Sequence, residues 1–408
     1  MPVNLAQPIK KNIFSIPGIS LGTIESGIKY ANRKDLTLIL LDEGSIVAGV
    51  FTKNQFLAAP VKVAKYHLSL GSNKRALLIN TGSANAGTGD VGIDNAKQTC
   101  HALAQILNIS ENQVLPFSTG VIMTELPVGK IIDSLDPLIK NVGPANWVDA
   151  AIAIMTTDTV PKASSTSTII EGNEVKVTGI SKGSGMINPN MATMLAFIGT
   201  DANINEAMLK EITREVCDAS FNKITVDGDT STNDSFVITA TRQSNHPQIT
   251  KKNASYARLK EALLEVAGFL SKAIVRDGEG ATKFIEIIIE QGIDEQDCQK
   301  VGKSIANSPL VKTAFFASDP NLGRIMAAIG NAPIGSIDVS LIDIYLNDIL
   351  FAQQGFAAPA FTEIMGKEEM KKDEICLKVV MGRGQFNSSV WTSDLSYDYV
   401  KINAEYRT

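Results

Sequence analysis

Cysteine and histidine are both scarce in this 408-residue sequence, and neither is clustered. The cysteines share no Cys-X-X-Cys spacing and stand at Cys100, Cys217, Cys298 and Cys376. The histidines stand at His67, His101 and His246. These spacings indicate no zinc ribbon and no disulfide framework, and they leave few partners for a histidine-dependent triad. We therefore predict no metal site and no chemistry that depends on histidine.

Excess positive charge and long apolar runs are also missing, and aromatic residues are few. The net charge is −5 at pH 7 and aromatic residues make up 6% of the chain. No run approaches the roughly 18 apolar residues of a membrane-spanning helix, and the first residues show no signal-peptide pattern. We therefore expect no nucleic-acid or membrane partner and a cytoplasmic location. Hydrophobic residues at 44% are typical of a globular protein, and the length predicts two or three domains.

Short strand patterns alternate with helix patterns along the whole chain. Apolar runs at 36–42 and 45–51 flank Glu43-Gly44 and predict a hairpin. Further helices are expected at 94–107 and 254–273, and further strands at positions that include 310–316 and 394–403. Many successive strands are separated by too few residues for the crossover that a parallel pair needs. We therefore predict a mixed α/β chain with antiparallel or mixed sheets.

Residues 87–92 have the Gly-X-Gly-X-X-Gly spacing of a dinucleotide-binding turn, between a strand and a helix. A dinucleotide site also needs an acidic residue at the end of the next strand, about 20 positions further on. Glu111 instead precedes the strand expected near 113–117. We therefore interpret 87–92 as a tight strand-to-helix turn, and keep a nicotinamide-dependent oxidoreductase as the weaker alternative.

The loop at 227–234 is rich in side-chain oxygens, which is one feature of a calcium site. An EF-hand loop needs glycine at its sixth position and glutamate at its twelfth. The corresponding residues are Thr232 and Ile238. We therefore interpret this loop as a hydrogen-bonded turn.

The segment from Lys182 to Phe197 has glycine and proline directly before an apolar strand that starts at Thr193. The residues alone allow two interpretations. The first is a loop followed by a core strand. The second is an N-terminal-nucleophile enzyme, in which self-cleavage frees a threonine whose own α-amine activates its hydroxyl without histidine.

Eight motifs, in this order, resemble the bifunctional ornithine acetyltransferase / glutamate N-acetyltransferase family of arginine biosynthesis. They are Asn-Ala-Gly-Thr-Gly at 85–89, Ser-Thr-Gly-Val at 118–121, Met-Thr-Thr-Asp-Thr at 155–159, the 182–197 segment, Val-Asp-Gly-Asp-Thr-Ser-Thr-Asn-Asp at 226–234, Arg-Asp-Gly-Glu-Gly at 276–280, Ser-Asp-Pro-Asn-Leu-Gly-Arg at 318–324 and the tail at 394–408. Each motif alone is modest, but all of them in one order are highly specific. The resemblance favours a nucleophilic Thr193.

The resemblance also implies a processing step and a set of site residues. Cleavage of the Ala192–Thr193 bond would leave an α chain of residues 1–192 and a β chain of residues 193–408. Thr193 would become the nucleophile, and Thr119 and Gly120 match the family's oxyanion hole. The family's substrate contacts match Thr156, Lys182, Thr193, Glu279, Asn403 and Thr408.

The implied reaction is ping-pong transfer of an acetyl group from N2-acetyl-L-ornithine to L-glutamate, through acetyl-Thr193. An amino-acid substrate carries a carboxylate and an amine, and Lys182 and Glu279 have the matching charges. No bound cofactor is implied, and acetyl-CoA is a candidate second donor. The implied fold is a four-layer αββα sandwich that resembles N-terminal-nucleophile hydrolases but is topologically distinct from them. The implied assembly is a heterotetramer of two α and two β chains.

The sequence departs from the family pattern at a few positions. Met123, Gly87 and Leu322 stand where the pattern has glycine, cysteine and tryptophan. None of these is a proposed nucleophile or substrate contact. Two functions from other classes stay open: a hydrolase or aminopeptidase on the same scaffold, and an uncleaved binding protein.

Overall fold

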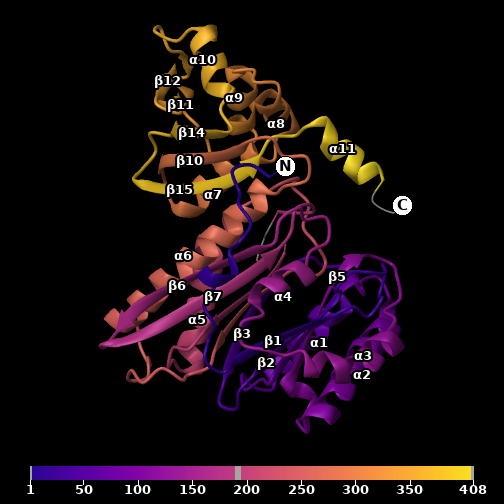
Figure 1. The fold of residues 1–408 in the computed structure, drawn as a ribbon. Coiled ribbons are helices and arrows are strands. Elements are labelled where there is room, and N and C mark those ends of the chain that lie inside the picture. Colours follow the sequence, from indigo (N-terminus) through magenta and orange to yellow (C-terminus); the bar gives the residue numbers. More distant parts are fainter. Residues whose placement is uncertain (1, 189–193, 406–408) are drawn as a thin grey trace.

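The computed structural model describes residues 2–188 and 194–405, and its elements form two layered parts (Figure 1). We call the described residues up to 283 the body, and residues 284–396 the carboxyl-terminal unit. Each part has its own β-sheet structure and its own hydrophobic core. The last helix, α11, follows the carboxyl-terminal unit.

Two β-sheets of the body lie face to face. Within the described residues the first has the order β1-β2-β4-β5 and the second has the order β3-β9-β8-β7-β6. Their strands are β1 (Ile19–Ile24), β2 (Leu36–Leu41), β3 (Ile46–Phe51), β4 (Ala76–Ser83), β5 (Val114–Val121), β6 (Lys162–Ile170), β7 (Asn173–Lys182), β8 (Leu195–Thr200) and β9 (Ser235–Ala240). The β4–β5 and β8–β9 pairs are parallel, and the other neighbours are antiparallel. Both sheets are therefore mixed, as the sequence predicts.

Alternate residues of each strand pack into different cores, because successive side chains of a strand point to opposite faces. Leu77 of β4 packs between the sheets, whereas Leu78 packs toward the helices outside. Phe197 and Ile198 of β8 divide in the same way. In the central core Phe117 meets Phe197 edge to face, with ring centroids 5.0 Å apart. This contact joins the two sheets directly.

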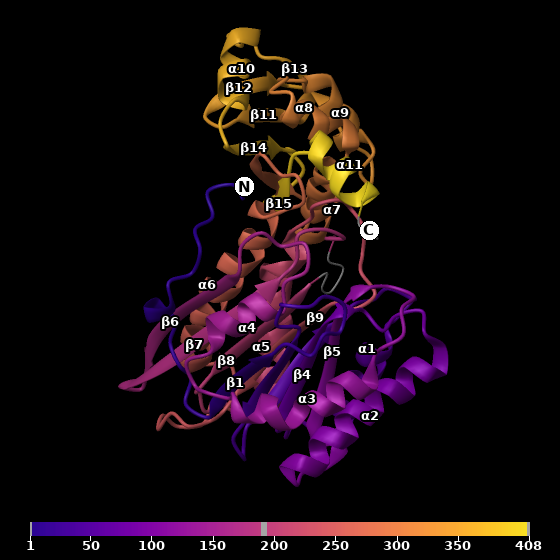
Figure 2. The same cartoon turned by 45° about the vertical axis from the view of Figure 1, so that its right-hand side comes forward.

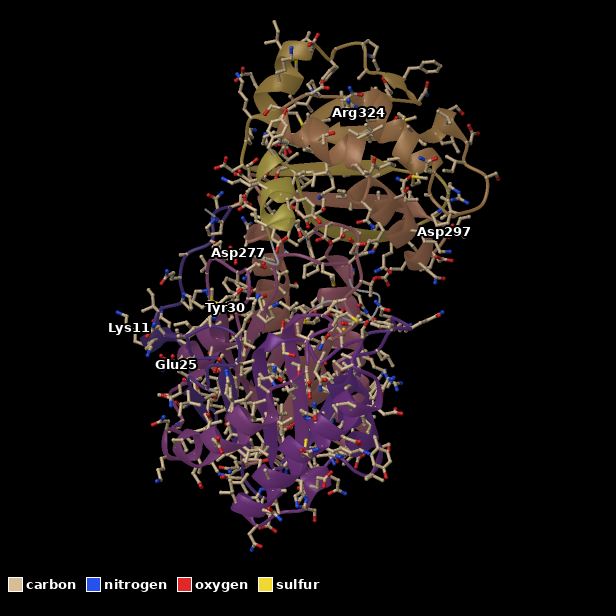
Figure 3. All side chains as sticks on the ribbon, turned by 90° about the vertical axis from the view of Figure 1, so that its right-hand side faces the viewer. Lys11, Glu25, Tyr30, Asp277, Asp297 and Arg324 are labelled. Carbon is tan, nitrogen blue, oxygen red and sulfur yellow. The ribbon has the colours of Figure 1, made fainter. Side chains whose placement is uncertain are left out.

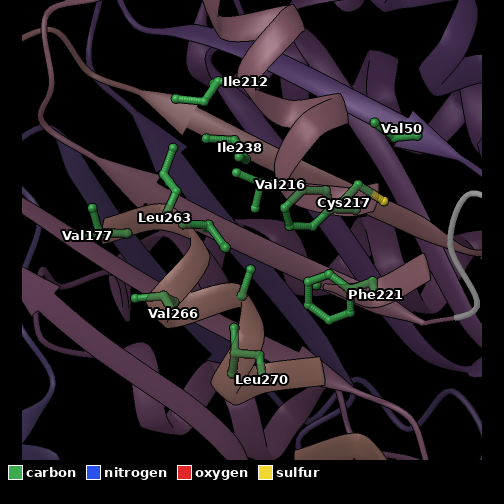
Figure 4. Packing of buried hydrophobic residues seen from close by; sticks show 14 of the residues in the cluster. Val50, Val177, Ile212, Val216, Cys217, Phe221, Ile238, Leu263, Val266 and Leu270 are labelled. Carbon is green, nitrogen blue, oxygen red and sulfur yellow. The ribbon is translucent and has the colours of Figure 1, made fainter. Parts of the chain in front are cut away.

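Helices cover both outer faces of the paired sheets (Figure 2). The first sheet is covered by α1 (Ala59–Ser69), α2 (Gly89–Leu107) and α3 (Val128–Lys140), and the second by α5 (Glu206–Ala219) and α6 (Ala254–Arg276). Leu263, Val266 and Leu270 of α6 pack with Val216 of α5 against the second sheet (Figure 4). The helix α4 (Trp147–Ala153) fills the edge between the sheets. The body is therefore a four-layer αββα sandwich, which confirms the expected fold class.

The carboxyl-terminal unit adds a mixed sheet with helices packed on it. Its described strands have the order β13-β12-β11-β14-β10-β15. They are β10 (Phe284–Gly292), β11 (Asp343–Leu346), β12 (Ile349–Gln353), β13 (Phe356–Ala357), β14 (Glu374–Val380) and β15 (Phe386–Ser393). The helices are α7 (Glu295–Ala306), α8 (Pro309–Phe316), α9 (Leu322–Gly330) and α10 (Glu363–Met370). Within residues 2–188 and 194–405 no helix is both long and apolar enough to cross a lipid bilayer.

The helix α11 (Tyr397–Ala404), yellow in Figure 1, leaves the carboxyl-terminal unit beside α8. Tyr397 packs edge to face on Phe316 at the end of α8, with ring centroids 5.4 Å apart. The Ser396 hydroxyl caps the helix by accepting the Asp398 N–H, and it donates to the Gly280 carbonyl over 2.6 Å. These contacts bring α11 to the loop that follows α6.

The hairpin predicted at 36–51 is wrong in its pairing, although both strands exist. β2 pairs with β1 and β4 in the first sheet, whereas β3 pairs with β9 in the second. The chain crosses between the sheets at Gly44, whose φ of +88° suits glycine. Both strands are largely buried on both faces, which requires a layer on either side and not a solvated two-stranded hairpin.

Two other predicted strands are helical. Residues 310–316 belong to α8, where Ser308 accepts the Val311 N–H and Pro309 takes the first helical position. The apolar run alone does not distinguish a short strand from a buried helix, and the capping signal decides it. The strand predicted at 394–403 is wrong in the same way: β15 ends at Ser393, and Ser396 then starts α11.

Candidate functional site

A cavity of about 290 Å³ lies in the body where β5 and β7 end and β8 begins. Its walls contain these predicted site residues: Thr119, Gly120, Thr156, Lys182, Glu279 and Asn403. Ala192, Thr193 and Thr408 lie outside the described residues. Met194 and Leu195, which follow Thr193 in the sequence, also line the cavity. The structure therefore brings together residues that are up to 284 positions apart in the sequence, from Thr119 to Asn403.

The predicted oxyanion pair lies at the end of β5, which is parallel to β4. Gly120 has a φ of +135°, and a Cβ there would lie 2.3 Å from the carbonyl carbon of Gly82. Only glycine fits this approach of two strands. The hydroxyl oxygen of Thr119 accepts a hydrogen bond from Lys182 Nζ over 3.3 Å. The Thr119 hydroxyl hydrogen is then available to donate to an atom in the cavity.

Asn233 fixes the position of this strand end. Its Nδ2 donates to the Ser118 carbonyl over 2.9 Å and to the Ala84 carbonyl over 2.6 Å. Ser118 Oγ donates in turn to Asn80 Oδ1 over 2.5 Å. These buried hydrogen bonds join the loop before β9 to β5 and β4, so the backbone at Thr119 is held by side chains as well as by the sheet.

Lys182 is the last residue of β7, and its ammonium is a cation at the cavity wall. Burial lowers its pKa from the ordinary value, and the carboxylate of Asp158 acts against that shift. A partly desolvated ammonium gains from an anionic ligand, because burial removes the competing water. A substrate carboxylate is such a ligand.

Glu279 provides a negative charge on the same cavity and is 8% exposed. Its Oε2 accepts a hydrogen bond from Asn403 Nδ2 over 2.8 Å, which ties α11 to the cavity. A Cβ at Gly185 would lie 2.4 Å from the Glu279 carboxylate, so the absence of a side chain at Gly185 leaves the space that this carboxylate occupies. Cation and anion are thus both present at one cavity, as an α-amino acid requires.

Asp234 is a cavity residue that the sequence reasoning missed. It is 2% exposed, and its Oδ2 has no hydrogen-bond partner among the described residues. Burial raises the pKa of this carboxyl well above its ordinary value, against the smaller effects of hydrogen bonding with Ser231 and of the charge of Lys182. The residue stands in the 226–234 motif, but its burial depends on β8 and β9 being neighbours, which the sequence does not reveal.

The chain passes from β4 to α2 at the glycine-rich segment, as predicted: Gly87 lies in the connection, and Gly89 and Gly92 belong to the first turn of α2. Asn85 occupies the inside of this turn: its Nδ2 donates to the Gly92 carbonyl over 2.9 Å, and its Oδ1 accepts from Thr88 Oγ1 over 2.9 Å. The glycines thus belong to a turn that the hydrogen bonds of Asn85 hold closed.

The oxygen-rich loop at 227–234 forms the predicted hydrogen-bonded turn. Asp227 accepts the Met186 N–H over 2.6 Å, the Ile187 N–H over 2.9 Å and the Asp229 N–H over 3.2 Å. Burial raises the pKa of this carboxyl, against those three hydrogen bonds. In the described part of the chain, no three or more His, Cys, Asp or Glu side chains gather as a metal site would require.

Two departures from the family pattern are in contact with each other. A Cβ at Gly87 would lie 2.2 Å from Sδ of Met123. Met123 has a φ of +64°, a conformation that glycine adopts more easily. Glycine at position 87 therefore accommodates methionine at position 123. The third departure, Leu322, starts α9 in the carboxyl-terminal unit and is not among the residues that line the cavity.

A second cavity, of about 200 Å³, shares Gly120 and Thr156 with the first. Its other walls include Lys29, Tyr30 and Arg33. Gly120 therefore borders both cavities, whereas Thr119 borders only the first.

Comparison with known proteins gives a consistent result. A family model described as ArgJ family matches residues 20–408. The chain is 49% identical, over an aligned length of 424 that covers 100% of both proteins, to the Arginine biosynthesis bifunctional protein ArgJ of Colwellia psychrerythraea strain 34H. The crystal structure of the bifunctional protein argJ from Bacillus halodurans is 36% identical and covers 50% of this chain and 95% of its own, with a TM-score of 0.48. Ornithine acetyltransferase from Mycobacterium tuberculosis, solved with ornithine, is 29% identical and covers 46% of this chain and 96% of its own, with a TM-score of 0.39.

Proposed function

Because the chain belongs to the ArgJ family and is an acetyltransferase of arginine biosynthesis, we propose that it transfers an acetyl group from N2-acetyl-L-ornithine to L-glutamate. One observation carries the proposal: a single cavity is lined by Thr119 and Gly120, by a cation and by an anion. The same cavity is lined by Met194, the residue after the expected nucleophile. Together these groups suit acyl transfer between two amino acids.

The enzyme matures by cleaving its own Ala192–Thr193 bond. The products are an α chain of residues 1–192 and a β chain of residues 193–408. The new α-amine of Thr193 then removes the proton from its own hydroxyl, so no histidine is needed. His67 and His246 fit this proposal, because both are buried and bonded to backbone groups outside the cavity.

In the first half-reaction the Thr193 oxygen attacks the acetyl carbonyl carbon of acetylornithine. The Thr119 hydroxyl and the Gly120 N–H stabilise the resulting oxyanion, and the ornithine amine leaves after it takes up a proton. In the second half-reaction the glutamate amine attacks the acetyl ester, which frees Thr193 and gives N-acetyl-L-glutamate. Losing one oxyanion donor of this kind typically costs about 3–4 kcal/mol of barrier.

Lys182 binds the α-carboxylate that both substrates share, and Glu279 faces an amine. Thr156 and Asn403 complete the contacts, together with Thr408. Lys182 Nζ lies 3.3 Å from the Thr119 hydroxyl oxygen. This distance supports the assignment, because the group that binds the carboxylate then lies next to the reacting carbonyl.

Acetyl-CoA is the candidate second donor, which would allow synthesis of N-acetylglutamate without acetylornithine. Its support is the second cavity, which shares walls with the first and extends the space past Gly120. A cytoplasmic location and a heterotetramer of two α and two β chains complete the proposal by family resemblance.

Two measurements test the proposal. Mass spectrometry of the purified protein should find fragments of about 20.6 and 23.1 kDa, scaled from 43.7 kDa for 408 residues, and the larger should begin TMLAF. Incubation with acetylornithine should give N-acetylglutamate when glutamate is present and little free acetate when it is absent. Rapid acetate release without glutamate would support a hydrolase instead. An intact chain with full activity would contradict the maturation step.

A parallel assay with acetyl-CoA as the only donor decides whether the second activity exists. N-acetylglutamate formed from acetyl-CoA and glutamate supports a bifunctional enzyme. Transfer from acetylornithine alone identifies a monofunctional one.

A further inference from the structure

Three fully buried charged side chains lie beneath the cavity and do not line it. Lys162 Nζ is 2.7 Å from Asp158 Oδ1 and 2.6 Å from Asp277 Oδ2. The side chains are 0%, 0% and 1% exposed, respectively. Lys162 is the first residue of β6, whereas the two carboxylates come from loops that continue into cavity residues.

Asp158 holds two of the cavity segments together. Its Oδ2 accepts the N–H of Thr156 over 3.0 Å, and its Oδ1 accepts the N–H of Gly183 over 2.7 Å. Gly183 directly follows Lys182. The carboxylate therefore joins the loop that carries Thr156 to the strand end that carries Lys182.

Asp277 joins the third segment, which carries Glu279 two residues later. Its carboxylate accepts the N–H of Thr159 over 3.0 Å and that of Val160 over 3.3 Å, and also bonds the Thr159 hydroxyl. The Glu279 N–H itself donates to the Ser184 carbonyl over 2.8 Å. Figure 3 shows Asp277 where the body meets the carboxyl-terminal unit.

The charges of the cluster also act on the cavity. Burial acts to raise the pKa of Asp158, but Lys162 and then Lys182 hold it well below the ordinary value. The ionised Asp158 in turn opposes the lowering of the pKa of Lys182. Buried ion clusters add little net stability, because desolvation offsets their attraction, so geometry is the more substantial contribution of this one.

We propose that Asp158, Lys162 and Asp277 form a positioning cluster, which fixes the segments of Thr156, Lys182 and Glu279 relative to one another. The cluster touches no substrate and acts through those three residues. The identity of the substrate rests on the proposed function, whereas the cluster's geometry does not. A misplacement of about 1 Å in a contact residue can cost on the order of 100-fold in rate.

The test compares Asp277→Asn and Lys162→Met with the control Lys74→Met. Lys74 is another buried lysine of the body, 2% exposed; its Nζ donates over 2.8 Å to the carbonyls of both His67 and Asn112, and it does not line the cavity. For each purified protein we would measure the thermal midpoint, the affinity for ornithine by calorimetry, and kcat and KM with acetylornithine and glutamate. Asp277→Asn keeps the shape of the side chain, so it remains informative if Lys162→Met does not fold.

We expect Asp277→Asn to raise KM and the ornithine Kd and to lower kcat/KM by about 10- to 100-fold, while the protein stays folded at the assay temperature. Lys74→Met should lower the thermal midpoint and leave KM and Kd near the wild-type values. Wild-type KM and Kd in folded Asp277→Asn, with only a lower thermal midpoint, would overturn the positioning role. A wild-type protein that binds ornithine but transfers no acetyl group would contradict the proposed function alone, because the ornithine Kd would still decide the role of the cluster.

Discussion

The body and the carboxyl-terminal unit each contain a lysine that donates to a threonine hydroxyl, yet the two pairs lie in different surroundings. In the body, Lys182 donates to Thr119 over 3.3 Å, and both residues line the cavity. In the carboxyl-terminal unit, Lys312 donates to Thr392 over 3.0 Å and also to the Ser393 carbonyl, and these side chains are buried. The same chemical pair therefore borders a cavity in the body and is enclosed in the carboxyl-terminal unit, so only the Lys182 pair is proposed to bind a ligand. The difference between a candidate site and a structural contact is thus whether a cavity borders the pair, more than which residues form it.

The largest effect is expected from the proposed nucleophile, Thr193. Thr193→Ala should remain uncleaved and inactive, because no hydroxyl is left for either step. Thr193→Ser should retain some cleavage and some transfer. Gel electrophoresis and the acetylornithine assay measure both. Transfer activity in Thr193→Ala would mean that another residue carries the acetyl group.

The next effect compares the two threonines directly. Thr119→Val should lower kcat by roughly 100- to 1000-fold, because it removes one donor to the oxyanion. Thr392→Val should leave kcat/KM unchanged and lower the unfolding free energy by about 1–3 kcal/mol, because Lys312 loses a hydrogen-bond acceptor. Steady-state kinetics and thermal unfolding on both variants check the pair. Equal losses of kcat would remove the distinction between the two regions.

A smaller loss of activity is expected from removing the residues after α11, the helix that joins the carboxyl-terminal unit to the cavity. Removing Arg407 and Thr408 should barely change folding or self-cleavage, since terminal residues usually bury little surface. It should lower kcat/KM for acetylornithine by about 10- to 100-fold if the tail completes the cavity. Val400→Ser, at a position on α11 that is 65% exposed, is the control and should be neutral. A wild-type kcat/KM in the truncated enzyme would show that Thr408 is not a substrate contact.

The smallest effect on catalysis is expected from Lys312→Met, which should leave kcat/KM unchanged and alter the stability and its pH dependence. Burial lowers the pKa of Lys312 to about 8, against about 10.4 for an exposed lysine. Between these values the unfolded state binds more protons, so this lysine makes the wild type more stable as the pH rises. Relative to Lys312→Met, wild-type stability should therefore increase from pH 7 to pH 10, by at most about 3 kcal/mol. Denaturant unfolding at both pH values measures the difference, and a constant difference would contradict the lowered pKa.

Much of the body was predictable because its patterns are local. Helical spacing predicted α6, and the strands β2 and β3 were recognised from their apolar runs. Their pairing was not predictable, because an apolar run does not reveal which sheet receives it. The apolar run at 310–316 fits a strand as well as a helix, and only the start signals of α8, Ser308 and Pro309, indicate the helix.

The motifs predicted the residues that line the candidate site, but not the buried charges that hold those residues in place. Resemblance pointed to Lys182 and Glu279, which do line one cavity. Lys162 and Asp277 lie 115 positions apart in the sequence, so their ion pair could not be predicted from it. Each residue alone is typical of a charge on the surface. Burial turns these charges into a cluster, and burial depends on how the two sheets stack.

Transfer through acetyl-Thr193 is tested most directly by the mass of each chain after the enzyme is mixed with acetylornithine without glutamate. We expect an increase of about 42 Da on the chain that begins at Thr193, and none on the other chain. Addition of glutamate should remove that mass and yield N-acetylglutamate. An acetyl group found only on residues 1–192, or full transfer activity with no acetylated chain at any time, would contradict the central claim.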